Sequence, residues 1–247
     1  LSGYADGTLP PLPATWRWIT ADDCTTRLTV GHVGPMQTRY VSNGIPFLRS
    51  QNVRENRISP DGLQYIAEDF HRELAKSALT PGDVVIVRSG APGVAAVVPD
   101  DLTVANCADL VIARFSSHIL PELMVRFINS EECRRRVFAR QVGVAQQHFN
   151  VGAMRTLPVP LIPHEEQYEL LRILREHEVV LAAVRERVRA STSHLDHLEA
   201  AALGKAFRGE LVPQDPADEP ASALLARIRA ERTGPARATR RRAPTPA

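Results

Sequence analysis

A repeating pattern of apolar residues between about residues 164 and 209 constrains the fold of this chain more than any other feature. The segment contains no proline, and its only glycines are Gly204 and the terminal Gly209. A period of 3.5 residues keeps one apolar stripe facing a partner helix, so the pattern predicts a long coiled-coil helix at 164–209. Ten positions separated by alternating steps of four and three form this seam, and eight of them are apolar: Leu170, Leu174, His177, Leu181, Val184, Val188, Ser191, Leu195, Leu198 and Ala202.

Two polar residues, His177 and Ser191, interrupt the seam. His177 fits either a tolerated polar layer or a polar layer that fixes register and partner choice. At about 1.5 Å per residue, a helix of this length extends on the order of 65 Å. We therefore expect it to extend well beyond a compact domain and to bury its seam against another long helix.

The segment from about residue 15 to 163 has a different character, because short apolar runs alternate with Gly, Pro and Asn. Strands are predicted within four segments: 41–53, 84–87, 93–99 and 110–115. Helices are predicted in two segments: 69–79 and 121–141, where Pro121 suits the first turn. The fold class expected is an α+β (mixed α/β) domain followed by a long coiled-coil-forming α-helix.

The two ends of the chain differ from both zones. Residues 1–14 have the glycine and proline content of a linker, and Leu1 indicates a trimmed start or one part of a longer chain. Residues 210–247 comprise a Pro-rich hinge, a short helix in 221–232 and a tail rich in arginine. That basic tail is either solvated and nonspecific or in contact with nucleic acid.

Composition and charge limit the classes of function. The chain has 247 residues, with 30 Lys and Arg against 28 Asp and Glu, and its formal net charge is +2. This balance excludes a protein that holds nucleic acid by bulk charge alone, but it permits a locally basic face. No apolar run approaches the ~20 residues of a membrane span, and no membrane partner is expected. Cys24, Cys107 and Cys133 lack CxxC spacing, which favours thiols of a reducing cytoplasm over a disulfide framework or a zinc site.

The usual catalytic motifs are not found in the sequence. It has no GxxxxGK(S/T) phosphate loop, no GxSxG elbow and no HExxH motif. Asp61, Glu73 and Lys76 loosely suggest a metal-dependent nuclease, but the step from Glu to Lys is one residue too long and the segment reads as helix. The glycine-rich segment 89–93 is interpreted as a tight loop between strands, because Pro92 removes an N–H donor. We expect no catalytic residues, no metal site and no cofactor in this chain.

Polar side chains gather instead in loops of the α+β segment. Arg, Asn and Gln can read base edges with two hydrogen bonds, while Ser and Arg can grip phosphates. The alternative for each is an ordinary solvated loop residue. Together these residues make a DNA-reading face plausible: Arg49, Ser50, Gln51, Asn52, Arg54, Arg88, Ser89, Gln146, Gln147, His148 and Asn150.

Four segments, in order, resemble the specificity subunit of type I restriction-modification systems. They are GIPFLRSQNV (44–53), LTPGDVVIVRSGAPGVAAVV (79–98), QHFNVGAMRTLPVPLIPHEEQ (147–167) and LGKAFRGELVPQDPADEPASALLARIRAER (203–232). The last of these is the most distinctive, and the resemblance covers roughly residues 13–232. It implies a target-recognition domain at 15–163 and a coiled-coil spacer helix at 164–209.

The resemblance also implies a function and partners. Specificity subunits carry recognition domains that each read one half of a split DNA sequence, separated by an antiparallel pair of long helices. Catalysis belongs to methylation subunits, which use S-adenosylmethionine, and to a restriction subunit driven by ATP and Mg²⁺. The partners implied are double-stranded DNA, methylation subunits, a restriction subunit and a second recognition half.

The chain departs from the family pattern in two respects. A full specificity subunit has two recognition domains and two long helices, whereas this chain has one of each. It is therefore either the C-terminal half of a full subunit or a half-size subunit that pairs with itself. Ile162-Pro163-His164 stands where the family prefers Pro-Pro followed by an apolar residue. The alternative function is a noncatalytic coiled-coil assembly adaptor whose DNA-binding face is degenerate.

Overall fold

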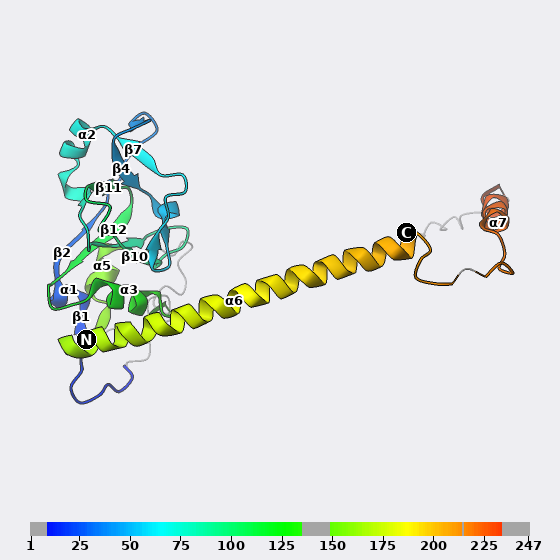
Figure 1. Cartoon of the computed structure of the whole chain (residues 1–247). Helices are drawn as coiled ribbons and strands as arrows, with labels where there is room; N and C mark the ends of the chain where they lie inside the picture. The colour runs from blue at the N-terminus through cyan, green and yellow to red at the C-terminus, as the bar shows by residue number, and fades with distance from the viewer. Residues whose placement is uncertain (1–8, 135–148, 214, 234–247) are drawn as a thin grey trace, which may run out of the picture. The chain divides into compact units, whose positions relative to one another are not determined.

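The computed structural model describes residues 9–134, 149–213 and 215–233 (Figure 1). The chain divides into two compact units, Leu1–Val179 and Val180–Ala247. All the strands of the described residues lie in the first unit, which is called the body below.

A four-stranded antiparallel sheet forms the centre of the body. Its strands β2 (Thr25–Val30), β9 (Val84–Val87), β10 (Ala95–Val97) and β12 (Leu110–Phe115) lie in the order β10-β9-β12-β2. Every residue of β9 is buried. Because successive side chains of a strand point to opposite faces, Val84 and Ile86 enter one core, while Val85 and Val87 enter another. Burial on both faces explains why this strand reads as a continuous apolar run.

The first core is covered by short helices and a small sheet. The helices are α1 (Ala21–Cys24), α3 (Pro121–Asn129) and α5 (Val151–Arg155), and the sheet pairs β1 (Arg17–Thr20) with β13 (Pro158–Leu161). Fully buried Phe149 and Met154 fill the space next to the central sheet. This core fixes the end of the segment that precedes α5.

A five-stranded sheet in the order β3-β7-β4-β11-β8 lies beyond the second core. Its strands are β3 (Tyr40–Val41), β4 (Ile45–Leu48), β7 (Gln64–Ile66), β8 (Ala78–Leu79) and β11 (Ala105–Cys107). Smaller elements accompany it: η1 (Ser50–Asn52), the hairpin β5 (Val53–Arg54)–β6 (Arg57–Ile58), α2 (Glu68–Glu73) and η2 (Ala75–Ser77). A Cβ atom on Gly44 would lie 2.4 Å from the carbonyl oxygen of Ile66, so the turn between β3 and β4 requires glycine.

The strands predicted from the sequence are confirmed, but one predicted helix ends early and the other is interrupted. The helix expected at 69–79 ends at Glu73, and Ala78–Leu79 form β8, which pairs with β11. The helix expected at 121–141 ends at Asn129, because the Ser130 backbone is extended and its N–H and hydroxyl both donate to the carbonyl of Phe127. A second helical stretch follows at 131–134, and the rest of the predicted helix, 135–141, lies outside the described residues.

The long helix α6 (His164–Phe207) has 44 residues and confirms the predicted helix to within two residues. Its first turns are anchored in the body. Gln167, which is 2% exposed, donates from Nε2 to the carbonyls of His118 and Ile162, and its Oε1 accepts from the N–H of Leu120. At the other end, Gly209 adopts φ +73° and the N–H of Glu210 donates to the carbonyl of Lys205.

A shorter helix follows α6 in the second unit. The helix α7 (Ala221–Thr233) confirms the short helix predicted in the second unit.

The three cysteines are buried thiols without disulfide partners. Burial raises the pKa of the Cys24 thiol to about 11, and it raises the pKa of the Cys107 thiol further. Within the described ranges, no helix is long and apolar enough to cross a membrane.

Candidate nucleic-acid interface

Segments far apart in the sequence meet at one cleft of the body. A cavity of about 310 Å³ lies between η1, β5 and the loop that follows β9. Ser50, Gln51 and Arg54 line it from one side, and Ser89 lines it from the other. Two of the three loop segments that sequence analysis selected for a DNA-reading face therefore share a surface.

The third segment reaches the same region through its backbone. The N–H of Phe149 donates to the carbonyl of Arg88 at 3.1 Å, which holds the chain before α5 against the end of β9. Asn150 is exposed, and its Oδ1 caps α5 by accepting from the N–H of Ala153 at 2.8 Å. The other members of this segment lie outside the described residues: Gln146, Gln147 and His148.

Arg49 and Gln51 are held in place by one carbonyl group. The guanidinium of Arg49 donates to the carbonyl of Gly62 at 2.7 Å, and the amide of Gln51 donates to the same oxygen at 3.3 Å. Arg49 also lies over the ring of Tyr40, with its Cζ 5.7 Å from the ring centroid. Each side chain keeps further N–H groups and accessible surface, so both can still donate to a ligand.

Asn52 corrects one part of the expected DNA face, because it is fully buried. Its Oδ1 accepts from the N–H of Arg49 at 3.0 Å, and its Nδ2 donates to the carbonyls of Ser59 and Asp61 at 3.1 and 3.0 Å. These bonds occupy the side chain inside the protein. Asn52 therefore positions the turn that carries Arg49 and Gln51, and it does not itself face the exterior.

Carboxylates offset part of the positive charge near the cleft. Arg88 forms an ion pair with Asp109, and the two side chains are 24% and 45% exposed. Glu55, which lines the cleft, pairs with Arg134 at 2.6 Å. Arg54, the last residue of β5, is exposed. The net positive charge near the cleft is therefore smaller than the number of nearby arginines suggests.

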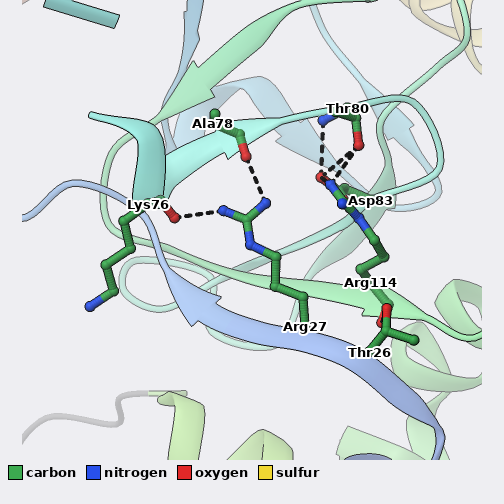
Figure 2. Close-up of polar contacts among 7 residues, drawn as sticks. All are labelled: Thr26, Arg27, Lys76, Ala78, Thr80, Asp83 and Arg114. Atoms are coloured by element: carbon green, nitrogen blue, oxygen red, sulfur yellow. Dashed lines mark hydrogen bonds and ion pairs between the residues drawn. The ribbon is translucent and has the colours of Figure 1, made fainter. Parts of the chain in front are cut away.

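A second group of arginines in the body is engaged in holding the fold (Figure 2). Arg114 donates from Nε and Nη2 to the carboxylate of Asp83 at 2.7 and 2.9 Å, and Asp83 is fully buried. The same carboxylate accepts from the N–H of Thr80 at 2.9 Å. The hydrogen bond between Arg114 and Asp83 is the main cause of the raised pKa of Arg114. Arg27, opposite Arg114 in the β2–β12 pair, donates to the carbonyls of Lys76 and Ala78. This corner ties the central sheet to β8.

The seam predicted on α6 is exposed over most of its length. Leu170 is half-buried and Leu174 is 37% exposed, while Leu181 and Leu195 are 51% and 65% exposed. His177 is also exposed, and its Nδ1 lies 2.8 Å from the carbonyl of Ile173 on the same helix. The other predicted interface residues are about half exposed or more: Val184, Val188 and Leu198. A row of large apolar side chains in this state calls for a covering surface.

Among the described residues, no group of three His, Cys, Asp or Glu side chains could hold a metal ion. Asp61, considered as part of a nuclease triad, accepts instead from the hydroxyl of Ser59 at 2.8 Å.

Comparison with known proteins identifies relatives of one kind. No protein-family model matches the chain. It is 27% identical over 203 residues to the type I restriction enzyme EcoBI specificity subunit of Escherichia coli, covering 78% of this chain and 42% of that protein. It is 26% identical over 204 residues to the EcoKI specificity subunit of E. coli strain K12, covering 76% and 44%. A shorter match of 92 residues at 33% identity covers 34% of this chain and 21% of the EcoDI specificity subunit.

Two solved structures share the fold. A chain from a structure that describes the complex assembly and conformational transition of a type I R-M system superposes with a TM-score of 0.65 and 21% identity, covering 81% of this chain and 48% of that one. The HsdS subunit from Thermoanaerobacter tengcongensis gives 0.57 and 20%, covering 81% and 47%. The α+β fold class and the resemblance stated from the sequence are both confirmed. The chain spans less than half the length of the relatives and structures that it matches.

Proposed function

We propose that this chain, which is similar to the specificity subunits of type I restriction-modification systems, reads one half of a bipartite DNA sequence and carries no catalytic residues. The observation that carries the proposal is the meeting of η1, β5 and the loop after β9 at one cleft of the body, with Phe149 before α5 hydrogen-bonded to the end of β9. Base-reading side chains need such a scaffold, because loops held by a packed core lose little entropy on binding.

The geometry supports base contact more strongly for some residues than for others. Arg49 and Gln51 are the strongest candidates for reading bases, since Asn52 and the carbonyl of Gly62 hold them in place while they stay accessible. Arg88 is better suited to a phosphate, which would compete with Asp109 for its guanidinium. Ser50, Arg54, Ser89 and Asn150 would support these contacts.

The partners proposed follow from the same resemblance. Methylation subunits would supply S-adenosylmethionine chemistry, and a restriction subunit would supply translocation with ATP and Mg²⁺, all in the cytoplasm. The second recognition half would come from a longer chain or from a second copy, paired through the seam of α6. The end of α6 would contribute to the surface for the methylation subunits, where Phe207 is 89% exposed beside Arg208–Glu210.

Mapping of methylated bases in cells with and without this gene tests the proposal. The expected result is a bipartite motif that is methylated only when the gene is present. A variant with both Arg49→Ala and Gln51→Ala should lose or relax one half of that motif. Arg17→Ala is the matched control, because Arg17 is an exposed arginine of β1 in the other small sheet. An unchanged methylation pattern after removal of the gene contradicts the proposal.

The exposed seam of α6 favours a second candidate, a coiled-coil adaptor that assembles partners without reading DNA. Titration with a selected duplex and with random duplexes at several salt concentrations distinguishes the two. A sequence reader retains an excess affinity for its own site as salt rises, whereas a degenerate face binds all duplexes with the same salt slope.

A further inference from the structure

The segment between β2 and β4, which includes β3, contributes a charged group that does not belong to the candidate interface described so far. Residues 33–35 and 37–39 are exposed, as are residues 41–44, whereas Met36 between them is buried. The N–H of Arg39 donates to the carbonyl of Met36 at 2.9 Å. The loop is therefore anchored at its middle, and Arg39 is carried at a fixed point next to that anchor.

The side chain of Arg39 rests on an aromatic ring. Its Cζ lies 4.7 Å from the centroid of the Phe70 ring, on α2. Phe70 in turn meets His32 edge to face, with ring centroids 6.0 Å apart, and packs against a core cluster of Met36, Phe47 and Ile66. A guanidinium held on a ring loses less conformational entropy when it binds than one on a solvated side chain.

Arg49 is held in the same way by the same cluster. Its Cζ lies over the ring of Tyr40, and Tyr40 meets Phe47 with ring centroids 6.1 Å apart. Both guanidinium groups thus rest on aromatic rings that pack against one small core. Neither forms an ion pair with a carboxylate among the described residues, whereas Arg88 and Arg114 both do. These two cations keep their full charge for a ligand.

We infer that Arg39 is a further specificity-determining residue, which reads a guanine next to the bases read by Arg49 and Gln51. The inference rests on the proposed function. Stacking on Phe70 occupies the face of the guanidinium and leaves its N–H edge to donate. That edge matches N7 and O6 of guanine in the major groove, where a bidentate arginine is the commonest specific contact. A phosphate contact could use the same fork, but it would carry no preference for one base.

Selection from a pool of random duplexes tests the inference, using the full chain co-expressed with its methylation subunit. The wild-type protein is expected to select a motif with a guanine at a defined position. Arg39→Ala should weaken the preference for that guanine by about 5- to 150-fold and leave the other positions unchanged. Arg39→Lys should restore affinity without restoring the full preference for that guanine, because it keeps the charge and loses the fork. Arg17→Ala serves as the control for loss of an exposed arginine; β1 and α2 lie at opposite ends of the body (Figure 1).

Three outcomes overturn the inference. If Arg39→Ala selects the wild-type motif, Arg39 does not read DNA. If Arg39→Ala weakens binding to all duplexes equally and Arg39→Lys restores it, Arg39 contacts a phosphate. If the wild-type protein selects no motif, the proposed function fails and the inference fails with it. The first two outcomes leave the proposed function standing, so the two failures are distinguishable.

Discussion

The body buries its large apolar side chains, whereas the distal part of α6 exposes them. In the body, every residue of β9 is buried and the central sheet feeds two cores. On α6, Val180, Leu181 and Leu195 are each more than half exposed, and ion pairs within the helix, such as Arg189–Glu186, solvate its surface. The body buries its apolar side chains in its own cores, whereas α6 presents a surface whose burial requires another chain or segment.

The same contrast recurs on a smaller scale among the arginines of the body. Arg114 donates to the buried carboxylate of Asp83, and Arg27 donates to backbone carbonyls (Figure 2). Arg39 and Arg49 lie on rings and have no carboxylate partner among the described residues. Residue type alone therefore does not separate a structural arginine from one that is available to a ligand; its partners do.

The largest effect is expected from charges placed on the exposed apolar seam of α6. Leu181→Asp together with Leu195→Asp should weaken assembly through the seam by more than about 1000-fold, because each leucine loses about 2 kcal/mol of burial and gains a charge. The body should stay folded. Sedimentation velocity and circular dichroism measure the two effects.

A matched control places the same charges elsewhere on the helix. The control variant carries Ala183→Asp and Ala190→Asp. These positions lie two residues beyond Leu181 and Val188, on the side of α6 away from the seam. This variant should assemble like the wild type. Unchanged association of the leucine variant would show that the seam is not the interface.

Thiol reactivity sharpens the picture of a closed body. At pH 8 the Cys24 thiol, with its pKa raised from 9.0 to about 11, should carry about 100-fold less thiolate than an ordinary cysteine. Desolvation by burial is the main cause, so a thiol reagent should react at a normal rate once the protein unfolds. Labelling kinetics with and without urea measure this. Rapid labelling of Cys24 in the native protein would mean that this edge of the first core is open.

Loss of a structural arginine should lower stability and spare DNA preference. Arg114→Ala leaves the buried carboxylate of Asp83 without its main counter-charge, which should cost about 2–3 kcal/mol in the free energy of unfolding. Arg17→Ala should cost less than about 0.5 kcal/mol, since Arg17 is exposed. Urea denaturation provides both values. Equal stability of the two variants would remove the distinction drawn from Figure 2.

Patterns that depend on neighbours in sequence were the predictable part of this fold. The apolar run of β9 and the heptads of α6 predict a strand and a helix directly, because side-chain period follows backbone geometry. By contrast, Ala78–Leu79 read as the end of a helix because their strand is set by pairing with β11, about 26 residues away. A tertiary partner of this kind leaves no local pattern.

The candidate interface shows the same division. Residue type and loop position predicted a set of polar residues, and the structure brings several of them to one cleft. The sequence does not reveal that Asn52 is buried, that Arg88 pairs with Asp109, or that Arg39 lies over the Phe70 ring. Each of these depends on a residue that lies at least seven positions away, which composition and spacing do not encode.

Readout at the cleft is expected to change binding preference with little effect on stability. Arg49→Ala or Gln51→Ala should each reduce discrimination at one base pair by about 1–3 kcal/mol. Asn52→Ala should instead lower the free energy of unfolding by about 1–3 kcal/mol, because it leaves buried backbone groups unsatisfied. Competition binding with single-base variants of the selected duplex, together with urea denaturation, separates these effects. A stable Asn52→Ala protein that has lost preference at one base would reverse the roles assigned here.

The smallest expected effect concerns Arg88 and its ion pair. Arg88→Ala should reduce the slope of log affinity against log salt by about 1 or less, since Asp109 already shares the charge of the guanidinium. Asp109→Asn should act in the opposite direction and raise affinity for random duplexes by about 2- to 5-fold, the range expected when a partly exposed ion pair is released. Asp109 adopts φ +46°, a conformation that asparagine also tolerates, so this substitution leaves the backbone in place. Fluorescence anisotropy at several salt concentrations measures both changes, and the double variant should bind like Arg88→Ala. If all three variants bind like the wild type at every salt concentration, the ion pair only stabilises the loop after β11 and Arg88 does not contact phosphate.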